Sequence, residues 1–92
     1  YVASIVRYVG AFYAELGGLD ALTFSGGIGE NAPFIRRRVC EAVRHFGIRI
    51  DAAKNEENAQ DITAESSAVR VFVVPADEEL VVAAKTAAFL QL

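Results

Sequence analysis

The sequence contains no methionine and no tryptophan, only one cysteine and two prolines, and no long hydrophobic run. A single cysteine, Cys40, cannot form an internal disulfide, which is typical of proteins kept in a reducing compartment. No apolar stretch approaches the roughly 20 residues that span a membrane, and no segment has the pattern of a signal peptide. We therefore expect a cytoplasmic protein with no membrane association.

An excess of basic residues is also missing. The formal net charge is −3 and the isoelectric point is about 5.0, so the composition predicts no nucleic-acid partner. With 53% hydrophobic and 23% charged residues, the 92 residues can form one modest core. Because the chain starts at Tyr1 without a methionine, inside a helical pattern that no cap precedes, we expect it to be a fragment of a longer protein.

A run of glycines follows a short apolar segment. Residues 19–24 are typical of a strand, Gly26, Gly27 and Gly29 follow, and Asn31 then opens a helical pattern. Glycines at a strand-to-helix turn let the backbone approach a ligand closely, and N–H groups at a helix start favour an anion. The pattern predicts a phosphate or nucleotide site, with an ordinary turn that needs positive φ as an equal alternative.

Two helices are predicted around this turn. Apolar residues recur at intervals of three and four from Tyr1 to Leu16, and again from Ala32 to Phe46. Gly17 would end the first helix, Asn31 would be the N-cap of the second, and Cys40 would be a buried structural thiol within it. The arginines of the second helix are expected on a solvated face; they are Arg36, Arg37, Arg38 and Arg44.

The second half of the chain alternates between strand and loop patterns. A short strand is expected at residues 48–51, a polar surface loop at residues 52–61 and a brief return to strand at Ile62. The β-branched run from Val69 to Val74 predicts a strand that is buried on both faces. The whole order, α-β-α-β-(β)-β-α, is typical of an α/β sheet.

A last helix is expected to begin at residues 76–79, with Ala87 and Ala88 in its apolar stripe. If the two better strands run parallel, residues 26–31 and 77–79 emerge at the same sheet edge, where open α/β sheets bind ligands. Carboxylates are hard oxygen ligands that Mg²⁺ accepts, so a phosphate cradle facing them predicts a nucleotide-dependent phosphoryl transferase. From composition alone, helix-start charge is the simpler explanation of these carboxylates.

Two other interpretations stay open. Residues 27–32 fit G-x-G-x-x-G/A, and Asp51 follows roughly twenty residues later, as in a dinucleotide-binding βαβ module. A carboxylate at Glu30 beside a pyrophosphate and the absence of further βα units count against this module. The other interpretation is a purely structural or dimerisation segment that binds no nucleotide.

The glycine segment resembles a family signature. Residues 23–31 are similar to FTGGIGEN of the acetate kinase family, within the sugar kinase, Hsp70 and actin superfamily. Residues 47–51 with Asn55 resemble the family's GI-x-x-D…N continuation, and residues 69–80 its V-x-V-x-V-I-P-T-[DN]-E-E-L segment. Residues 7–12 resemble the helix that leads into the strand, so the likeness covers essentially all 92 residues in order.

The resemblance implies a fold, a reaction and ligands. The fold would be α/β, part of a ribonuclease H-like (actin-type ATPase) domain, and residues 1–92 would be the carboxyl-terminal segment of its nucleotide-binding domain. The reaction would be reversible phosphoryl transfer between ATP and acetate, giving ADP and acetyl phosphate, with Mg²⁺ as cofactor. Propionate kinase is the near alternative, because the family's acyl pocket lies outside this segment.

The resemblance also assigns residues. Glu78, the first glutamate of the D-E-E triplet, would bind Mg²⁺, and Ala76 departs from the threonine that usually caps this helix. Ser25 stands where the family often has glycine, alanine or threonine. The nucleotide-binding residues would be Gly27, Ile28, Gly29, Glu30 and Asn31.

Other parts of the family's site match nothing in this sequence. The substrate-binding arginines, the catalytic aspartate and histidine, and the amino-terminal phosphate loop are all missing, so no catalytic residue is assigned here. We expect the chain alone to be inactive and prone to self-association through its unsatisfied apolar edges. The full-length protein would be a homodimer.

Overall fold

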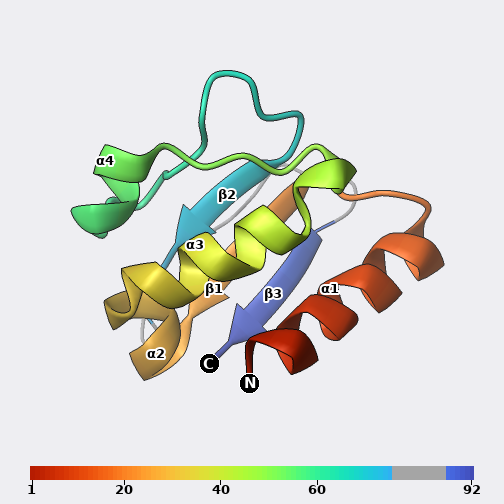
Figure 1. Cartoon of the computed structure of the whole chain (residues 1–92), viewed down its shortest axis with the longest axis horizontal. Helices are drawn as coiled ribbons and strands as arrows, with labels where there is room; N and C mark the ends of the chain where they lie inside the picture. The colour runs from red at the N-terminus through yellow and green to blue at the C-terminus, as the bar shows by residue number, and fades with distance from the viewer. Residues whose placement is uncertain (76–86) are drawn as a thin grey trace.

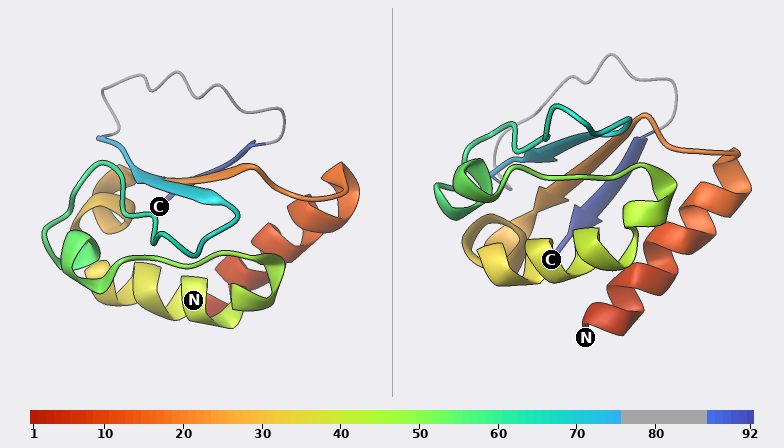
Figure 2. Two further views of the ribbon diagram at one scale, coloured as in Figure 1. Left: turned by 90° about the horizontal axis from the view of Figure 1, so that it is seen from above. Right: turned by 45° about the horizontal axis from the view of Figure 1, so that its top comes forward.

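The computed structural model describes residues 1–75 and 87–92. A sheet of three parallel strands has the order β2-β1-β3, with β1 (Ala21–Ser25) between β2 (Arg70–Val73) and β3 (Ala87–Gln91). Helices α1 and α3 lie side by side against one face of this sheet (Figures 1 and 2). The described residues therefore form two layers, as expected for an α/β domain.

Helix α1 confirms the first predicted helix. It spans Val2–Leu16, and it buries Ile5 and Val9 on the face that the apolar spacing indicates. It ends at Gly17, which has φ 73°, a left-handed conformation that glycine adopts without steric cost. None of the helices within the described residues has the length and hydrophobicity that crossing a bilayer demands.

The glycine turn is itself helical. The run folds into a short helix, α2 (Gly26–Asn31), and Ala32 separates it from α3 (Pro33–Ala42) and the 3₁₀ turn η1 (Arg44–Phe46). The prediction that Asn31 is an N-cap is wrong. Asn31 is the last residue of α2, and its Nδ2 donates a hydrogen bond to the Gly27 carbonyl oxygen at 3.0 Å.

The segment between α3 and β2 differs most from the prediction in its first half. In place of the strand expected at 48–51, the structure has a single antiparallel bridge between Ile50 and Thr63. The strand expected at Ile62 is also absent from the described residues; its neighbours Thr63 and Asp61 form this bridge and a second one, between Asp61 and Phe72. The expected surface loop contains helix α4 (Ala52–Glu56). This helix is short enough to lack an apolar period, and a side-chain cap stabilises it instead.

The end of the chain also differs. Strand β2 confirms the strand that the β-branched run predicts, but not its burial on both faces: Val71 and Val73 are buried, whereas Arg70 is exposed and Phe72 half-buried. Ala87 and Ala88 lie in β3 rather than in the expected last helix. The alternation of β3 buries Ala88 and Leu90 against the core while Phe89 points to the opposite face, 56% exposed. Residues 76–86, which hold the rest of the predicted helix and Glu78, lie outside the described residues.

The core lies between the sheet and the two helices. From β1, Leu22 and Phe24 point into it, while Thr23 between them is buried on the opposite face. Val39 of α3 and Val43, which directly follows this helix, complete its centre, and both are fully buried. The apolar faces of the helices, which repeat every three to four residues, and those of the strands, which alternate, thus pack into one apolar layer.

Truncating a core side chain should cost far more stability than truncating an exposed one of the same type. We expect Phe24→Ala to lower the free energy of unfolding by about 3–5 kcal/mol, because Phe24 is fully buried and its removal leaves a cavity. Phe34→Ala, at a side chain that is 52% exposed, should change it by less than about 0.5 kcal/mol. Urea unfolding measures both, and equal losses would contradict this assignment of the core.

The buried thiol predicts a pH dependence of stability. Burial raises the pKa of Cys40 to about 12, so the folded chain keeps its proton above pH 9 while the unfolded chain loses it. Stability should therefore fall as the pH rises from 9 to 11, with this group contributing up to about 1.4 kcal/mol per pH unit. Urea unfolding of Cys40→Ala should show a shallower decline over this range, and identical slopes would refute the assignment.

Candidate functional site

The carboxyl ends of β1 and β2 meet at one edge of the sheet. The two strands are parallel, and the Val74 N–H donates a hydrogen bond to the Phe24 carbonyl oxygen at 2.9 Å just beyond their ends. Helix α2 begins directly after β1, so residues 27–31 lie at the edge where α/β sheets bind ligands. The sequence continues from β2 toward Glu78, which lies outside the described residues.

One of the three glycines in α2 has an internal steric reason. Gly26 has φ 85°, and an added Cβ would lie 2.8 Å from the carbonyl carbon of Leu92. Gly29 is buried, but an added Cβ would lie 3.4 Å from the carbonyl carbon of Phe24, which is an ordinary van der Waals distance. The packing of α2 against the sheet therefore requires glycine at position 26.

Gly27 has no such reason. Its φ is not in the left-handed region, and among the described residues no atom lies within 4 Å of an added Cβ. The residue is exposed at the start of α2, so its missing side chain leaves open space beside the backbone. Open space over an exposed helix backbone is what the close approach of a ligand requires.

The other predicted nucleotide residues have different surroundings. Ile28 is 42% exposed, but its N–H donates to the Leu92 carbonyl oxygen at 3.3 Å. The Ile28 N–H is therefore already occupied by an acceptor within the chain. Glu30 is half-buried, and Asn31 is exposed with its amide turned back to Gly27.

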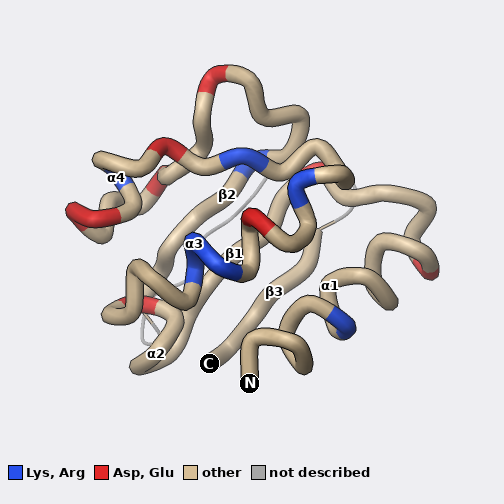
Figure 3. The backbone as a smooth tube through the Cα atoms, in the orientation of Figure 1, with Lys and Arg blue, Asp and Glu red and all other residues tan. Residues whose placement is uncertain are grey.

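Three consecutive arginines lie in α3 (Figure 3). The sequence analysis did not predict the role of one of them, Arg36. The expected solvated face holds for Arg37 and Arg38, which are exposed. It is wrong for Arg36, which is fully buried. The helical spacing carried the signal, because Arg36 lies between the buried residues Ile35 and Val39 on the inner face of α3.

The Arg36 guanidinium is held by neutral oxygen acceptors from α2, from α4 and from Asn58, which lies just after α4. Nη1 donates to the Gly29 carbonyl oxygen at 2.7 Å, and Nε donates to Asn55 Oδ1 at 2.7 Å. Nη2 donates to the Asn55 carbonyl oxygen at 2.7 Å and to Asn58 Oδ1 at 2.6 Å. Burial lowers the pKa of Arg36 from its ordinary value, and these four bonds replace the lost hydration.

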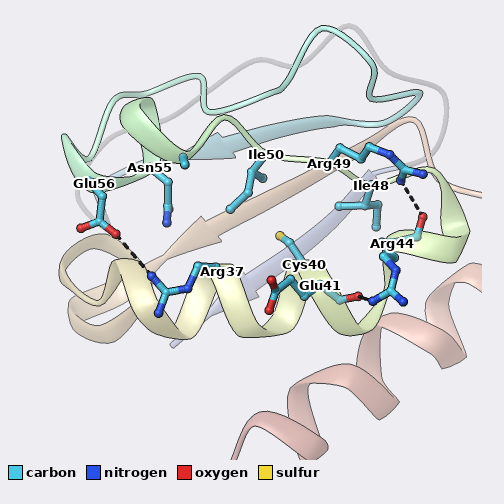
Figure 4. A pocket seen from close by; sticks show the side chains of 10 residues that line it. Arg37, Cys40, Glu41, Arg44, Ile48, Arg49, Ile50, Asn55 and Glu56 are labelled. Atoms are coloured by element: carbon cyan, nitrogen blue, oxygen red, sulfur yellow. Dashed lines mark hydrogen bonds and ion pairs between the residues drawn. The ribbon is translucent and has the colours of Figure 1, made fainter.

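A groove of about 400 Å³ lies between α3 and residues 48–56 (Figure 4). Cys40, Ile48 and Ile50 form its apolar lining. At one end the Arg37 guanidinium lies 3.6 Å from the Glu56 carboxylate. Residues 27–31 line neither this groove nor a second hollow between α1 and β3.

Asp51 has a structural role that bears on the dinucleotide interpretation. Its Oδ1 accepts a hydrogen bond from the Lys54 N–H at 3.0 Å, which caps α4. The segment before it forms only an antiparallel bridge, whereas the dinucleotide fold needs a second parallel strand there. Within residues 1–75 and 87–92, no three His, Cys, Asp or Glu side chains form a group that could hold a metal ion.

Comparison with known proteins is consistent along the whole chain. The acetate kinase of Phocaeicola vulgatus is 44% identical over 92 residues, which are 98% of this chain and 23% of that protein. The acetate kinase of Oleidesulfovibrio alaskensis is 49% identical over 86 residues, covering 90% of this chain and 21% of that protein. The chain thus spans about a fifth of the length of these curated relatives.

Solved structures agree. The crystal structure of Porphyromonas gingivalis acetate kinase matches with a TM-score of 0.76 and 41% identity, over 84% of this chain and 20% of that one. A propionate kinase from Francisella tularensis matches with a TM-score of 0.73 and 33% identity, over 82% of this chain and 19% of that one. The likeness confirms the predicted fold class, part of an actin-like ATPase fold. Because the profile of the Acetokinase family also matches residues 1–84, the chain belongs to that family.

Proposed function

We propose that this chain forms part of the nucleotide-binding domain of an acetate kinase, which transfers a phosphoryl group reversibly between ATP and acetate. The observation that carries the proposal is the glycine helix α2 at the carboxyl edge of the sheet, within a chain that resembles acetate kinases from end to end. Propionate kinase remains the alternative, because a solved propionate kinase matches the chain at 33% identity and the solved acetate kinases at 41% and 32%.

The nucleotide would bind against Gly27, Ile28, Gly29, Glu30 and Asn31. Gly27 supports this role because its backbone is open to a ligand. Ile28 would contribute its exposed side chain, since its N–H is already donated to Leu92. In phosphoryl transfer, positioning and charge neutralisation do most of the work, and a rigid backbone surface supplies the first of these.

Glu78 would hold Mg²⁺, which neutralises the charge of the transferred phosphates. It follows β2 by five residues, and β2 ends at the edge where α2 begins. Within this chain the ion would have Glu78 as its protein ligand, with waters and phosphate oxygens among its other ligands. The catalytic groups would come from the parts of the protein that this chain does not match.

The isolated chain would be inactive and would self-associate, whereas the full-length enzyme would act in the cytoplasm as a homodimer. Exposed aromatic side chains support the self-association, because Tyr8 and Phe89 are 48% and 56% exposed. Strand β3 is also an edge of the sheet among the described residues, and an unpaired edge invites pairing with another chain.

A chimaeric enzyme tests the function directly. The 92 residues would replace the matching segment of the Phocaeicola vulgatus acetate kinase, and acetyl phosphate formation would be assayed. Gly27→Ala should raise the KM for ATP by about tenfold or more, because a methyl group would obstruct the nucleotide. The same change should leave the free energy of unfolding unchanged or raise it by up to about 1 kcal/mol, because alanine favours helix.

Gly10→Ala is the matched control. Gly10 lies inside α1, and an added Cβ there also meets no described atom within 4 Å. This change should give a similar gain in stability and leave the KM for ATP unaltered. An unchanged KM in Gly27→Ala would contradict the proposed contact, and a chimaera that prefers NAD to ATP would favour the dinucleotide interpretation.

The metal assignment has a separate test. Glu78→Gln removes one carboxylate charge at nearly constant size, so the Mg²⁺ concentration that gives half-maximal activity should rise by about tenfold or more. Glu79→Gln, at the next residue of the same triplet, should shift it by less than about twofold. If Glu79→Gln has the larger effect, Mg²⁺ is held by the second glutamate and the assignment is wrong.

A further inference from the structure

We propose that Arg36 is a positioning residue that holds helix α2 in the geometry that binds the nucleotide. This inference rests on the proposed function, and it concerns a side chain that is fully buried and so does not reach the ligand from the surface.

The Gly29 carbonyl has no normal helical partner. In a continuous helix it would accept a hydrogen bond from the N–H of residue 33, but residue 33 is proline, which has none. Arg36 Nη1 occupies the place of that donor at 2.7 Å. The side chain therefore satisfies a buried carbonyl at the end of α2 and fixes the angle at which α3 leaves it.

The rest of the guanidinium is anchored in α4. Asn55 accepts from Nε and Nη2, and its own Nδ2 donates to the Pro33 carbonyl oxygen at 2.9 Å. Asn58 adds a further acceptor from a left-handed backbone conformation, φ 54°. Arg36, Asn55 and Asn58 thus form a hydrogen-bonded clamp that joins α2, the start of α3 and α4.

Helix α2 depends on such a clamp for its position. It has six residues, and isolated helices shorter than about 12 residues are marginal in water. The clamp grips Gly29, two residues from Gly27, whose open backbone is the proposed contact with the nucleotide. Loss of the clamp would let α2 shift, and a displacement of about 1 Å at a binding surface is enough to weaken its ligand strongly.

Three variants in the chimaeric enzyme test this role. Arg36→Lys keeps the charge but cannot reach acceptors in several directions, so the KM for ATP should rise by about tenfold or more. Asn58→Gly keeps the left-handed backbone and removes one acceptor, so a smaller rise of about threefold is expected. Arg37→Lys, at the exposed neighbour, is the control and should leave the KM for ATP unchanged.

The KM for acetate separates positioning from general stability. It should stay within about twofold in every variant, because the clamp acts only on the nucleotide side. A purely structural role would lower the melting temperature and the active fraction while leaving the KM for ATP unchanged in Arg36→Lys and Asn58→Gly, and that result would overturn the proposal. If Arg36→Lys does not fold, the KM for ATP of Asn58→Gly decides between the positioning role and a purely structural one.

Failure of the proposed function would look different. In that case the unsubstituted chimaera would not bind ATP at all, before any clamp residue is changed, and the positioning role would fall with it. An active chimaera in which only the clamp variants behave as the control does would overturn the positioning role alone.

Discussion

A buried positive charge needs hydrogen-bond acceptors, and this constraint determines how α2, α3 and residues 55–58 are arranged. Removing a charged group from water costs several kcal/mol, so the Arg36 guanidinium is tolerated only where carbonyl and amide oxygens surround it. Those oxygens come from α2 and from residues 55–58. The position of the glycine helix is thereby tied to a segment more than twenty residues further along the chain.

The glycines of α2 differ in how much space the structure leaves for a side chain. Gly26 lets the helix approach the backbone of Leu92, and Arg36 holds the helix through the Gly29 carbonyl oxygen. Gly27 alone faces outward with no internal need for a missing side chain among the described residues. A rigidly seated helix with one open backbone position is a surface on which a ligand can be placed accurately, because little ordering is needed on binding.

The predictable features are those with local patterns. The apolar period of α1 and the β-branched run of β2 each carry their own signal, and the structure has a helix and a strand there. The glycines after β1 form helix α2 rather than the expected turn. The burial of Arg36 was missed because the expectation for a charged residue outweighed its place on the inner face of α3. Helix α4 has too few residues for a period, and β3 depends on pairing with distant β1, which overrides a local helical pattern.

Much of the proposed site is encoded in one continuous stretch. The proposed nucleotide surface would be assembled mainly from residues that are close in sequence. They follow one another from strand β1 through helices α2 and α3 to the clamp residue Asn58. The edge itself needs only the parallel pairing of β1 with β2. Acyl specificity, by contrast, has no local signal in these residues. The proposed clamp couples α2 to α4 through residues of this stretch, and contacts that lie far from it would contribute nearly independently.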